Sequence, residues 1–347
     1  MKRASRNALI ATLLVLPLTA VVMVEVRRGL RSLDEPLKVT APQRFKVLPG
    51  SRFARVGTGL ADRGIVPSPR SWVLYARWKG LDTLVKAGEY EIEPGMTPRQ
   101  LLAKIDSGQV VLHSLTIVDG WRVHDLLSAM RRNPDILMTL PDEPTALMAR
   151  LGFPGIAAEG QFLPETYRFA TGTTDLEILR QAHAALSRVL DAAWLDRDAT
   201  IPLKSAYELL IMASIVEKES GLPDELPKIA GLYLHRLRIG MRLQADPTVL
   251  YGLGDDHEGD LHSVDLHTDG PYNTYTRVGL PPTPIALTGL AAIRATAHPE
   301  KTDALYFVAS AKGDGSHVFS ATLAEHDAAV IRYLERQRQK PAAENAR

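Results

Sequence analysis

The chain has 347 residues, which is too long for one minimal domain, so two domains are expected. Its 45% hydrophobic and 23% charged residues are ordinary for a globular protein, and a formal net charge of +1 gives no electrostatic reason to expect nucleic acid as a partner. The absence of cysteine excludes disulfide bonds, thiol catalysis and cysteine-based metal sites.

The N-terminus has the pattern of a membrane anchor. Lys2, Arg3 and Arg6 precede an uncharged, mostly apolar run from Ala8 to Val24. Such a run is near the lower limit of the about 17–25 residues that cross a bilayer, and the basic residues before it favour a cytoplasmic N-terminus. A cleaved signal peptide is the alternative, but bulky residues at 21–24 leave no clean cleavage site. We therefore expect a cytoplasmic segment over 1–7, a transmembrane helix over 8–26 and a juxtamembrane linker over 27–43.

A weak internal repeat follows the linker. Three β-type runs each end in a Pro-Gly or Asp-Gly turn and continue as amphipathic stretches, over 53–60, 98–105 and 123–130. The second is the clearest, with Thr97 as N-cap and Pro98 at the first helical position. The repeat predicts a small β-α subdomain over 44–130, although common turn chemistry alone can give the same pattern.

The remainder predicts a helix-rich domain with short strands, which makes the expected fold class α+β. Helices are expected over 175–195, 225–238 and 323–334. Strands at 304–308 and 317–320 are expected to form a hairpin across the turn at 312–315. This domain would span 131–337, and the tail over 338–347 is expected to be disordered.

The segment 205–220 is the most informative part of this domain. Ser205 followed by Glu208 is a capping-box pattern at the start of a helix. Gly221 and Pro223 provide the signal that ends it. The segment therefore reads as one helix.

Glu219 lies in the last turn of this helix and shares its apolar face. Its helical neighbours three, four and seven residues back are Val216, Ile215 and Met212. Burial and the negative end of the helix dipole both raise the pKa of a carboxyl group there, as a general acid requires. Glu217 faces a less apolar side and is a secondary candidate. A solvated or ion-paired carboxylate is the purely structural alternative.

Two polar segments further along suit a sugar ligand. Asp246 precedes a proline and reads as a helix N-cap, which explains it structurally, whereas Gln244 suits the hydroxyls and amides of a sugar. Tyr272, Asn273 and Tyr275 alternate aromatic and amide groups, as in the wall of a carbohydrate-binding cleft. A rigid surface loop is the alternative for this second segment.

The segment 159–168 also stands out, because it gathers aromatic residues and carboxylates, Glu165 among them, around a glycine and a proline without any period. Metal sites are not supported: His257, His262 and His267 have neither helical nor zinc-type spacing. The sequence contains no phosphate-binding loop, nucleophile elbow or dinucleotide fingerprint. No metal and no cofactor are expected.

Together these segments resemble the endolytic murein transglycosylase family, also called the YceG-like family. The matching stretches are 212–220, 235–252, 272–276 with 279–282, and 297–299. The resemblance covers nearly the whole chain. Thr283 and Thr288 stand where the family more often has Gly and Pro, and Glu165 stands where Asp is common.

The resemblance implies a bitopic inner-membrane protein with its bulk in the periplasm. It also implies that the 44–130 subdomain is LysM-like and that 131–337 is the catalytic transglycosylase domain. Proteins of this family cleave peptidoglycan glycan strands internally, and their catalytic glutamate falls on Glu219. Gln244, Tyr272, Asn273 and Tyr275 are then expected to position the substrate. Peptidoglycan synthases are possible partners, and nucleic acid is not expected.

The expected reaction cleaves the β-1,4 bond between N-acetylmuramic acid and N-acetylglucosamine and leaves 1,6-anhydro ends. Glu219 alone suffices, as acid and then base, since the nucleophile is the C6 hydroxyl of the substrate. A hydrolase of the muramidase type normally needs a second carboxylate roughly 5–10 Å away, and Glu217, Asp246 and Glu165 are candidates without being compelling. A non-catalytic peptidoglycan-binding scaffold of the elongation or division machinery is the alternative from another class.

Overall fold

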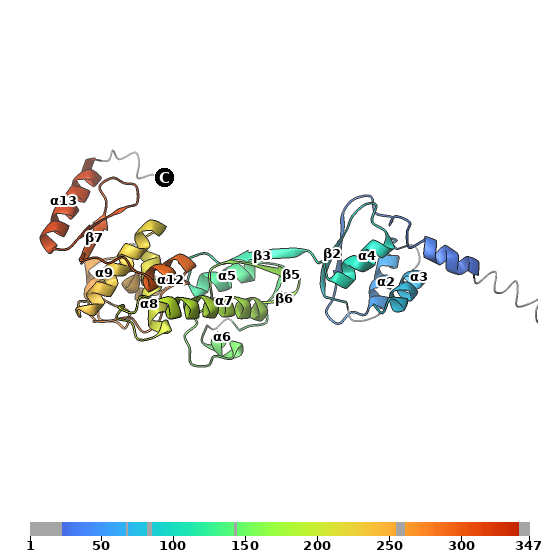
Figure 1. Ribbon diagram of the computed structural model, residues 1–347, viewed down its shortest axis with the longest axis horizontal. Helices are drawn as coiled ribbons and strands as arrows, with labels where there is room; N and C mark the ends of the chain where they lie inside the picture. The colour runs from blue at the N-terminus through green and yellow to red at the C-terminus, as the bar shows by residue number, and fades with distance from the viewer. Residues whose placement is uncertain (1–22, 67–68, 82–84, 142–143, 255–260, 340–347) are drawn as a thin grey trace, which may run out of the picture. The chain divides into compact units, whose positions relative to one another are not determined.

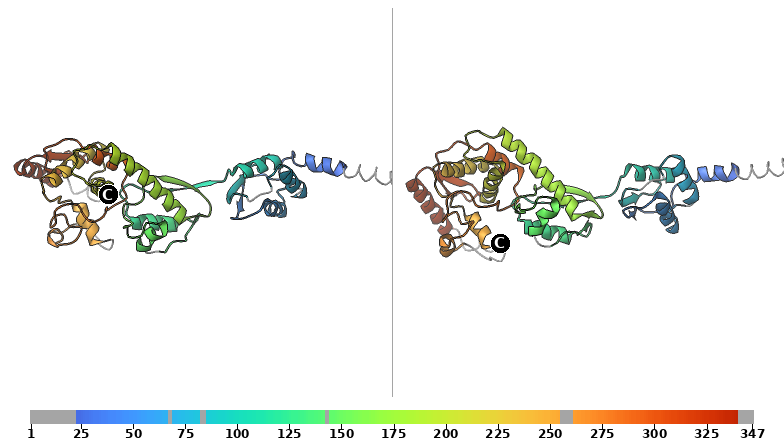
Figure 2. Two further views of the ribbon diagram at one scale, coloured as in Figure 1. Left: turned by 60° about the horizontal axis from the view of Figure 1, so that its bottom comes forward. Right: turned by 90° about the horizontal axis from the view of Figure 1, so that it is seen from below.

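The computed structural model describes residues 23–66, 69–81, 85–141, 144–254 and 261–339. Helices predominate in these residues, and the strands are short and form two-stranded sheets (Figure 1, Figure 2). The predicted α+β fold class is therefore confirmed.

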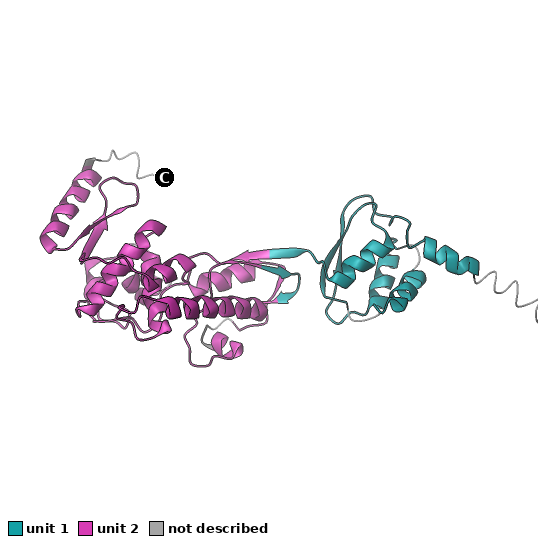
Figure 3. Cartoon of the chain, in the orientation of Figure 1, with its two compact units in different colours: residues 1–113, 168–173 teal, residues 114–167, 174–347 magenta. Residues whose placement is uncertain are grey.

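The chain divides into two compact units (Figure 3). Unit 1 comprises residues 1–113 and 168–173, and unit 2 comprises residues 114–167 and 174–347. The helix over 123–132, most of which lies inside the predicted 44–130 subdomain, belongs to unit 2. The domain boundaries derived from the sequence, and the LysM-like character of the subdomain, stay predictions.

Within the described residues, no helix is both long enough and apolar enough to cross a membrane. This finding contradicts the predicted single-pass inner-membrane location with the bulk of the chain in the periplasm. Residues 8–22 of the predicted spanning helix over 8–26 lie outside the described residues. Residues 23–31 are helical but carry several charges, including an ion pair of Arg28 with Glu25 at 3.5 Å. Such charges are costly inside a bilayer.

The core of unit 1 is built on β1 (Gln43–Val47), α2 (Phe53–Asp62), α3 (Pro69–Trp78), β2 (Gly88–Ile92) and α4 (Pro98–Ser107). The strands β1 and β2 are antiparallel. The core holds Trp72, whose ring lies 4.5 Å from that of Phe53 and whose Nε1 donates to the carbonyl of Pro98 at 2.8 Å. The predicted N-cap at Thr97 is confirmed, as a capping box with Gln100.

Four more strands form two small sheets. The strands are β3 (Leu112–Thr116), β4 (Ile136–Leu137), β5 (Thr166–Ala170) and β6 (Thr173–Thr174). β3 pairs with β5, and β4 pairs with β6.

The rest of unit 2 is mainly helical. Its helices are α5 (Val123–Arg132), α6 (Pro144–Leu151), α7 (Asp175–Asp196), α8 (Ala206–Glu219), the 3₁₀ helix η1 (Pro223–Glu225), α9 (Leu226–Arg238), α10 (Asp246–Leu253), α11 (Ser263–His267), α12 (Leu290–Ala297) and α13 (Leu323–Gln339). The predicted hairpin is confirmed as the antiparallel pair β7 (Tyr306–Ala309) and β8 (His317–Ser320). The predicted tail over 338–347 lies outside the described residues from residue 340 onward.

Helix α8 lies at the centre of unit 2 and contacts α7, α9, α10 and α12. Ser205 caps it by accepting from the backbone N–H of Glu208, whereas the Glu208 carboxylate accepts from Lys204. All eight residues from Leu209 to Val216 are buried. Both sides of the helix are therefore largely buried, although Ser214, three residues before Glu217, adds a buried hydroxyl group. What distinguishes the two carboxylates is the set of groups that surround each.

The close approach of α9 to the segment around Glu300 provides a test of this packing. Gly231 of α9 lies so near that a Cβ atom there would overlap the carbonyl oxygen of Glu300. Because this oxygen belongs to the backbone, we expect Gly231→Ala to lower the free energy of unfolding by about 1–3 kcal/mol in urea denaturation. Gly221→Ala, which meets no atom within 4 Å, is the control and should change it by less than about 0.5 kcal/mol. Equal effects of the two substitutions would contradict this packing.

Candidate active site

Glu219 is the last residue of α8 and is half-buried. The hydroxyl of Tyr233, a buried residue of α9, donates to its Oε1 at 2.5 Å. The two helices pack against each other, which fixes the donor beside the carboxyl group.

A cavity of about 360 Å³ opens beside Glu219. Its lining comes from α8, α9, the start of α10, the loop over 272–276, β7 and α13, and consists of Glu219, Tyr233, Arg236, Gln244, Asp246, Tyr275, Tyr306, Phe307, Leu323 and His326. All of these residues belong to unit 2. The cavity thus brings together Glu219, Gln244, Asp246 and Tyr275 from the residues predicted from the sequence.

Burial raises the pKa of Glu219 to about 7. The hydrogen bond from Tyr233 opposes this rise, the negative charge of Asp246 adds to it, and the positive charge of Arg236 opposes it. A carboxyl group with a pKa near neutral pH can both donate and accept a proton at that pH, which is what acid–base catalysis requires.

Arg236 is a buried cation that holds the edge of the cavity together. Its Nε donates to the carbonyl of Leu305 at 2.6 Å, and its Nη1 donates to the carbonyl of Leu243 at 2.5 Å. Its guanidinium also lies over the ring of Tyr306, 5.4 Å from the ring centre. Arg236 thereby ties α9 both to the strand β7 and to the segment that carries Gln244.

Gln244 has a left-handed backbone, with φ of 51°, and is the only non-glycine residue with a positive φ in the described part of the chain. Its N–H donates to the carbonyl of Thr274 at 3.2 Å, and the next N–H, of Ala245, donates to Thr274 Oγ1 at 3.0 Å. Backbone strain of this kind persists where the surroundings impose it, often at functional sites. Here the residue with the strained backbone is Gln244, whose side chain lines the cavity.

Asp246 does not cap α10 as predicted. The N-cap is Ala245, Asp246 is the first helical residue, and the N-cap makes no side-chain hydrogen bond to the first turn. It accepts instead from the hydroxyl of Tyr275 at 2.5 Å. Asp246 therefore lies in the Glu219 cavity and has a partner there that the sequence did not suggest.

Tyr272 and Asn273 do not line this cavity. Asn273 is 5% exposed, and its amide nitrogen donates to the carbonyls of Asp265, Leu266 and Thr268. Its oxygen accepts from the N–H of Tyr275 at 2.8 Å, so Asn273 acts on the loop that presents Tyr275. The hydroxyl of Tyr272 lies 2.8 Å from Thr283 Oγ1 and lines a different cavity.

The two other secondary candidates, Glu217 and Glu165, also lie outside the Glu219 cavity. Glu217 accepts from the N–H of Gly289, the N-cap of α12, at 3.0 Å, and burial raises its pKa. This bond joins α8 to the start of α12. Glu165 is exposed.

The sequence reasoning missed three residues. Tyr233 and Arg236 come from a helical stretch in which an aromatic residue reads as core, and no local signal marks their contact with α8. Glu159 stands out in the sequence only as part of the segment 159–168, yet burial raises its pKa to about 7 as well. Within the described ranges no group of three or more His, Cys, Asp or Glu side chains could hold a metal ion.

A polar cavity with a buried carboxyl group, a tyrosine donor and a strained backbone is typical of an acid–base enzyme in an α+β fold. Residues 45–332 match the YceG-like family, and the chain belongs to it.

Proteins similar to this chain are named for an enzymatic activity. It is 30% identical over 330 residues to a protein of Bacillus subtilis (strain 168) named endolytic murein transglycosylase, which covers 89% of this chain and 90% of that protein. A protein of Streptococcus pneumoniae serotype 2 with the same name is 28% identical, over 82% of this chain and 57% of its own length. A crystal structure of a putative YceG-like protein from Listeria monocytogenes is similar with a TM-score of 0.50 and 29% identity, over 84% of this chain and 99% of that one.

The hydrogen bond between Tyr233 and Glu219 can be tested by titration. Because the hydroxyl favours the ionised carboxylate, Tyr233→Phe should raise the pKa of Glu219 by about one unit. The ¹³C signal of the Glu219 side-chain carboxyl, followed from pH 5 to pH 9, measures this shift. Tyr306→Phe keeps a ring in the same cavity and should leave the pKa unchanged. An unmoved titration in Tyr233→Phe would rule out the role given to this hydroxyl.

The raised pKa of Glu219 also predicts a pH-dependent stability. Folding raises this pKa from 4.5 to about 7, so the folded protein loses stability as the pH rises through this interval. Glu219→Gln removes the loss, and should stabilise the protein by about 2–3 kcal/mol more at pH 8 than at pH 5. Urea denaturation at the two pH values measures the difference, and a gain independent of pH would contradict the assignment.

Proposed function

We propose that this chain is a lytic transglycosylase, a carbon–oxygen lyase that cleaves peptidoglycan glycan strands internally. The observation that carries the proposal is the carboxyl group of Glu219, with a pKa of about 7 at the end of a buried helix and beside a polar cavity. Membership of the YceG-like family and the name of the relatives support the substrate class.

In the proposed reaction, protonated Glu219 donates to the glycosidic oxygen of the β-1,4 bond between N-acetylmuramic acid and N-acetylglucosamine. The bond from this oxygen to C1 of the muramic acid breaks. The Glu219 carboxylate then takes the proton of the C6 hydroxyl, whose oxygen bonds to C1 and gives a 1,6-anhydro end. Glu219 is protonated again at the end, so one carboxyl group completes the cycle.

The groups around Glu219 suit both halves of this cycle. Burial and the negative charge of Asp246 favour the protonated acid, whereas Tyr233 and Arg236 stabilise the carboxylate that remains after the proton leaves. Neither protonation state is strongly preferred near pH 7. This balance is what a group that acts first as acid and then as base needs.

Gln244 and Tyr275 are proposed to position the sugar, since both line the cavity. Asn273 would act on this step only through the loop that carries Tyr275. The 44–130 region is proposed as a LysM-like glycan-binding subdomain beside a catalytic domain over 131–337. With both, the protein would process or terminate nascent glycan strands, with peptidoglycan synthases as its partners.

A muramidase-type hydrolase is the second candidate, because Asp246 lies in the same cavity as Glu219 and could activate water. We favour the lyase because the Asp246 carboxylate is already engaged by the hydroxyl of Tyr275. A non-catalytic scaffold has no use for the raised pKa of Glu219.

Product analysis separates these functions. Mass spectrometry of digested glycan strands should detect 1,6-anhydro ends, and cleavage should fall at least about a thousandfold in Glu219→Gln. Glu217→Gln, two residues away on the same helix, is the matched control and should keep cleavage. Reducing ends would support the hydrolase, and binding to sacculi without release of fragments would support the scaffold.

A further inference from the structure

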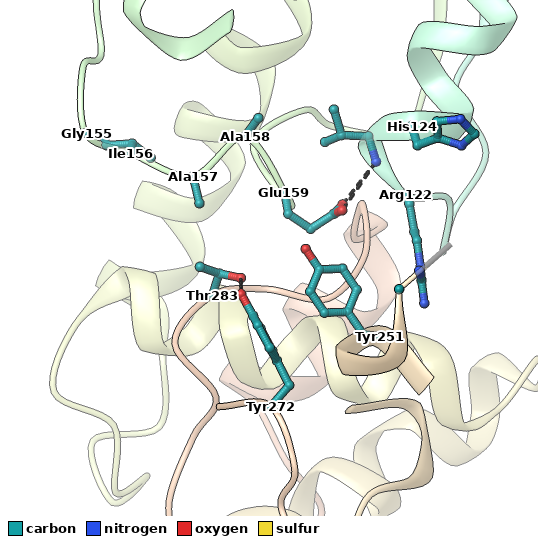
Figure 4. Close-up of a pocket in the computed structure, with 12 residues that line it drawn as sticks. Arg122, His124, Gly155, Ile156, Ala157, Ala158, Glu159, Tyr251, Tyr272 and Thr283 are labelled. Atoms are coloured by element: carbon teal, nitrogen blue, oxygen red, sulfur yellow. Dashed lines mark hydrogen bonds between the residues drawn. The ribbon is translucent and has the colours of Figure 1, made fainter. Parts of the chain in front are cut away.

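Unit 2 contains a second cavity, of about 640 Å³, around Glu159 (Figure 4). Its lining consists of Arg122, Val123, His124, Gly155, Ile156, Ala157, Ala158, Glu159, Tyr251, Gly254, Tyr272 and Thr283. Glu219 and the other residues of the proposed catalytic cavity are not among them. The proposed chemistry therefore leaves this cavity unexplained.

The carboxyl group of Glu159 points into the middle of this cavity (Figure 4). It accepts from the N–H of Val123, the first residue of α5, at 3.2 Å. This bond leaves part of the acceptor capacity of a carboxylate for a ligand.

One wall of the cavity is formed by aromatic side chains, and the opposite wall by a segment without aromatic residues. The rings of Tyr251 and Tyr272 meet edge to face, with their centres 4.8 Å apart, and Thr283 bonds to the Tyr272 hydroxyl. Across from them lies the exposed segment of Gly155 to Ala157, in which Ile156 is the one large side chain. Flat apolar rings beside a carboxyl and two hydroxyl groups suit the face and the hydroxyls of a pyranose.

The two cavities share two structural elements. Helix α10 carries Asp246 into the catalytic cavity and Tyr251 into the second one, about 8 Å further along its axis. The loop after α11 carries Tyr275 into the first and Tyr272, three residues earlier, into the second. Both cavities therefore lie within reach of one polysaccharide strand.

We infer that the Glu159 cavity is a second sugar-binding subsite, which holds an N-acetylated pyranose of the same glycan strand away from the bond that is cleaved. The Tyr251 and Tyr272 rings pack against the sugar, and Glu159 and Thr283 bind its hydroxyls. This inference rests on the proposed function, because it takes the ligand to be the glycan that Glu219 cleaves.

The test uses the full chain with Glu219→Gln, labelled with 3-fluorotyrosine and titrated with a hexamer of N-acetylglucosamine. The ¹⁹F signals of Tyr251, Tyr272 and Tyr275, assigned by substitution with Phe, report on each cavity separately. We expect all three signals to shift with one common Kd.

Ala157→Trp fills the second cavity from an exposed position and should abolish the shifts at Tyr251 and Tyr272. The shift at Tyr275 should persist with about tenfold weaker affinity. Ala192→Trp, on the exposed side of α7, is the matched control and should change neither the three ¹⁹F shifts nor the affinity. Glu159→Gln keeps the shape of the cavity and should weaken binding about tenfold, because an amide nitrogen, which cannot accept a hydrogen bond, replaces one carboxyl oxygen.

A hexamer that shifts the Tyr275 signal alone would overturn the inference, and so would shifts at Tyr251 and Tyr272 that survive Ala157→Trp. Shifts of these two signals by a free stem peptide and not by the hexamer would also overturn it. The proposed function is judged separately, by the anhydro ends that the unlabelled chain with Glu219 intact produces.

Discussion

Helix α8 ends in a carboxyl group that the folded protein holds partly buried, and this one constraint organises the site. Eight consecutive residues of α8 are buried before the chain reaches Glu219, so the packing of the helix fixes the position of this residue. Burial disfavours the ionised form, and the hydroxyl of Tyr233 together with the charge of Arg236 restores part of the balance. Both groups come from α9, so the packing of α8 on α9 sets the proton affinity of the site.

The sequence predicted the features that depend on neighbours along the chain. The bounds of α8 followed from Ser205 and from the Gly and Pro after it, and the hairpin of β7 and β8 followed from its turn. Glu219 was found because a carboxyl group at the end of an apolar helix is unusual. Gln244 was found because nothing in its local structure required a polar residue.

What the sequence could not predict depends on contacts between distant segments. Asp246 reads as an N-cap beside its proline, and only the fold shows that the cap is Ala245 and that Tyr275 binds the carboxylate. Asn273 looks like a ligand for a sugar, but its amide nitrogen donates to three carbonyl groups at the end of α11. For Glu159 the sequence showed only an unusual composition, because Tyr251, Tyr272 and Thr283, which line its cavity, lie about 90 to 125 positions further along the chain.

At Gln244 the left-handed backbone lowers the stability of the protein, while the side chain of this residue lines the cavity. Such a conformation costs a residue with a Cβ atom about 1–2 kcal/mol, and glycine would adopt it without this cost. Variants selected only for resistance to heat would therefore tend to acquire glycine here and lose the amide that faces the cavity. The most robust version of this chain and the one best suited to hold a substrate would be two different sequences.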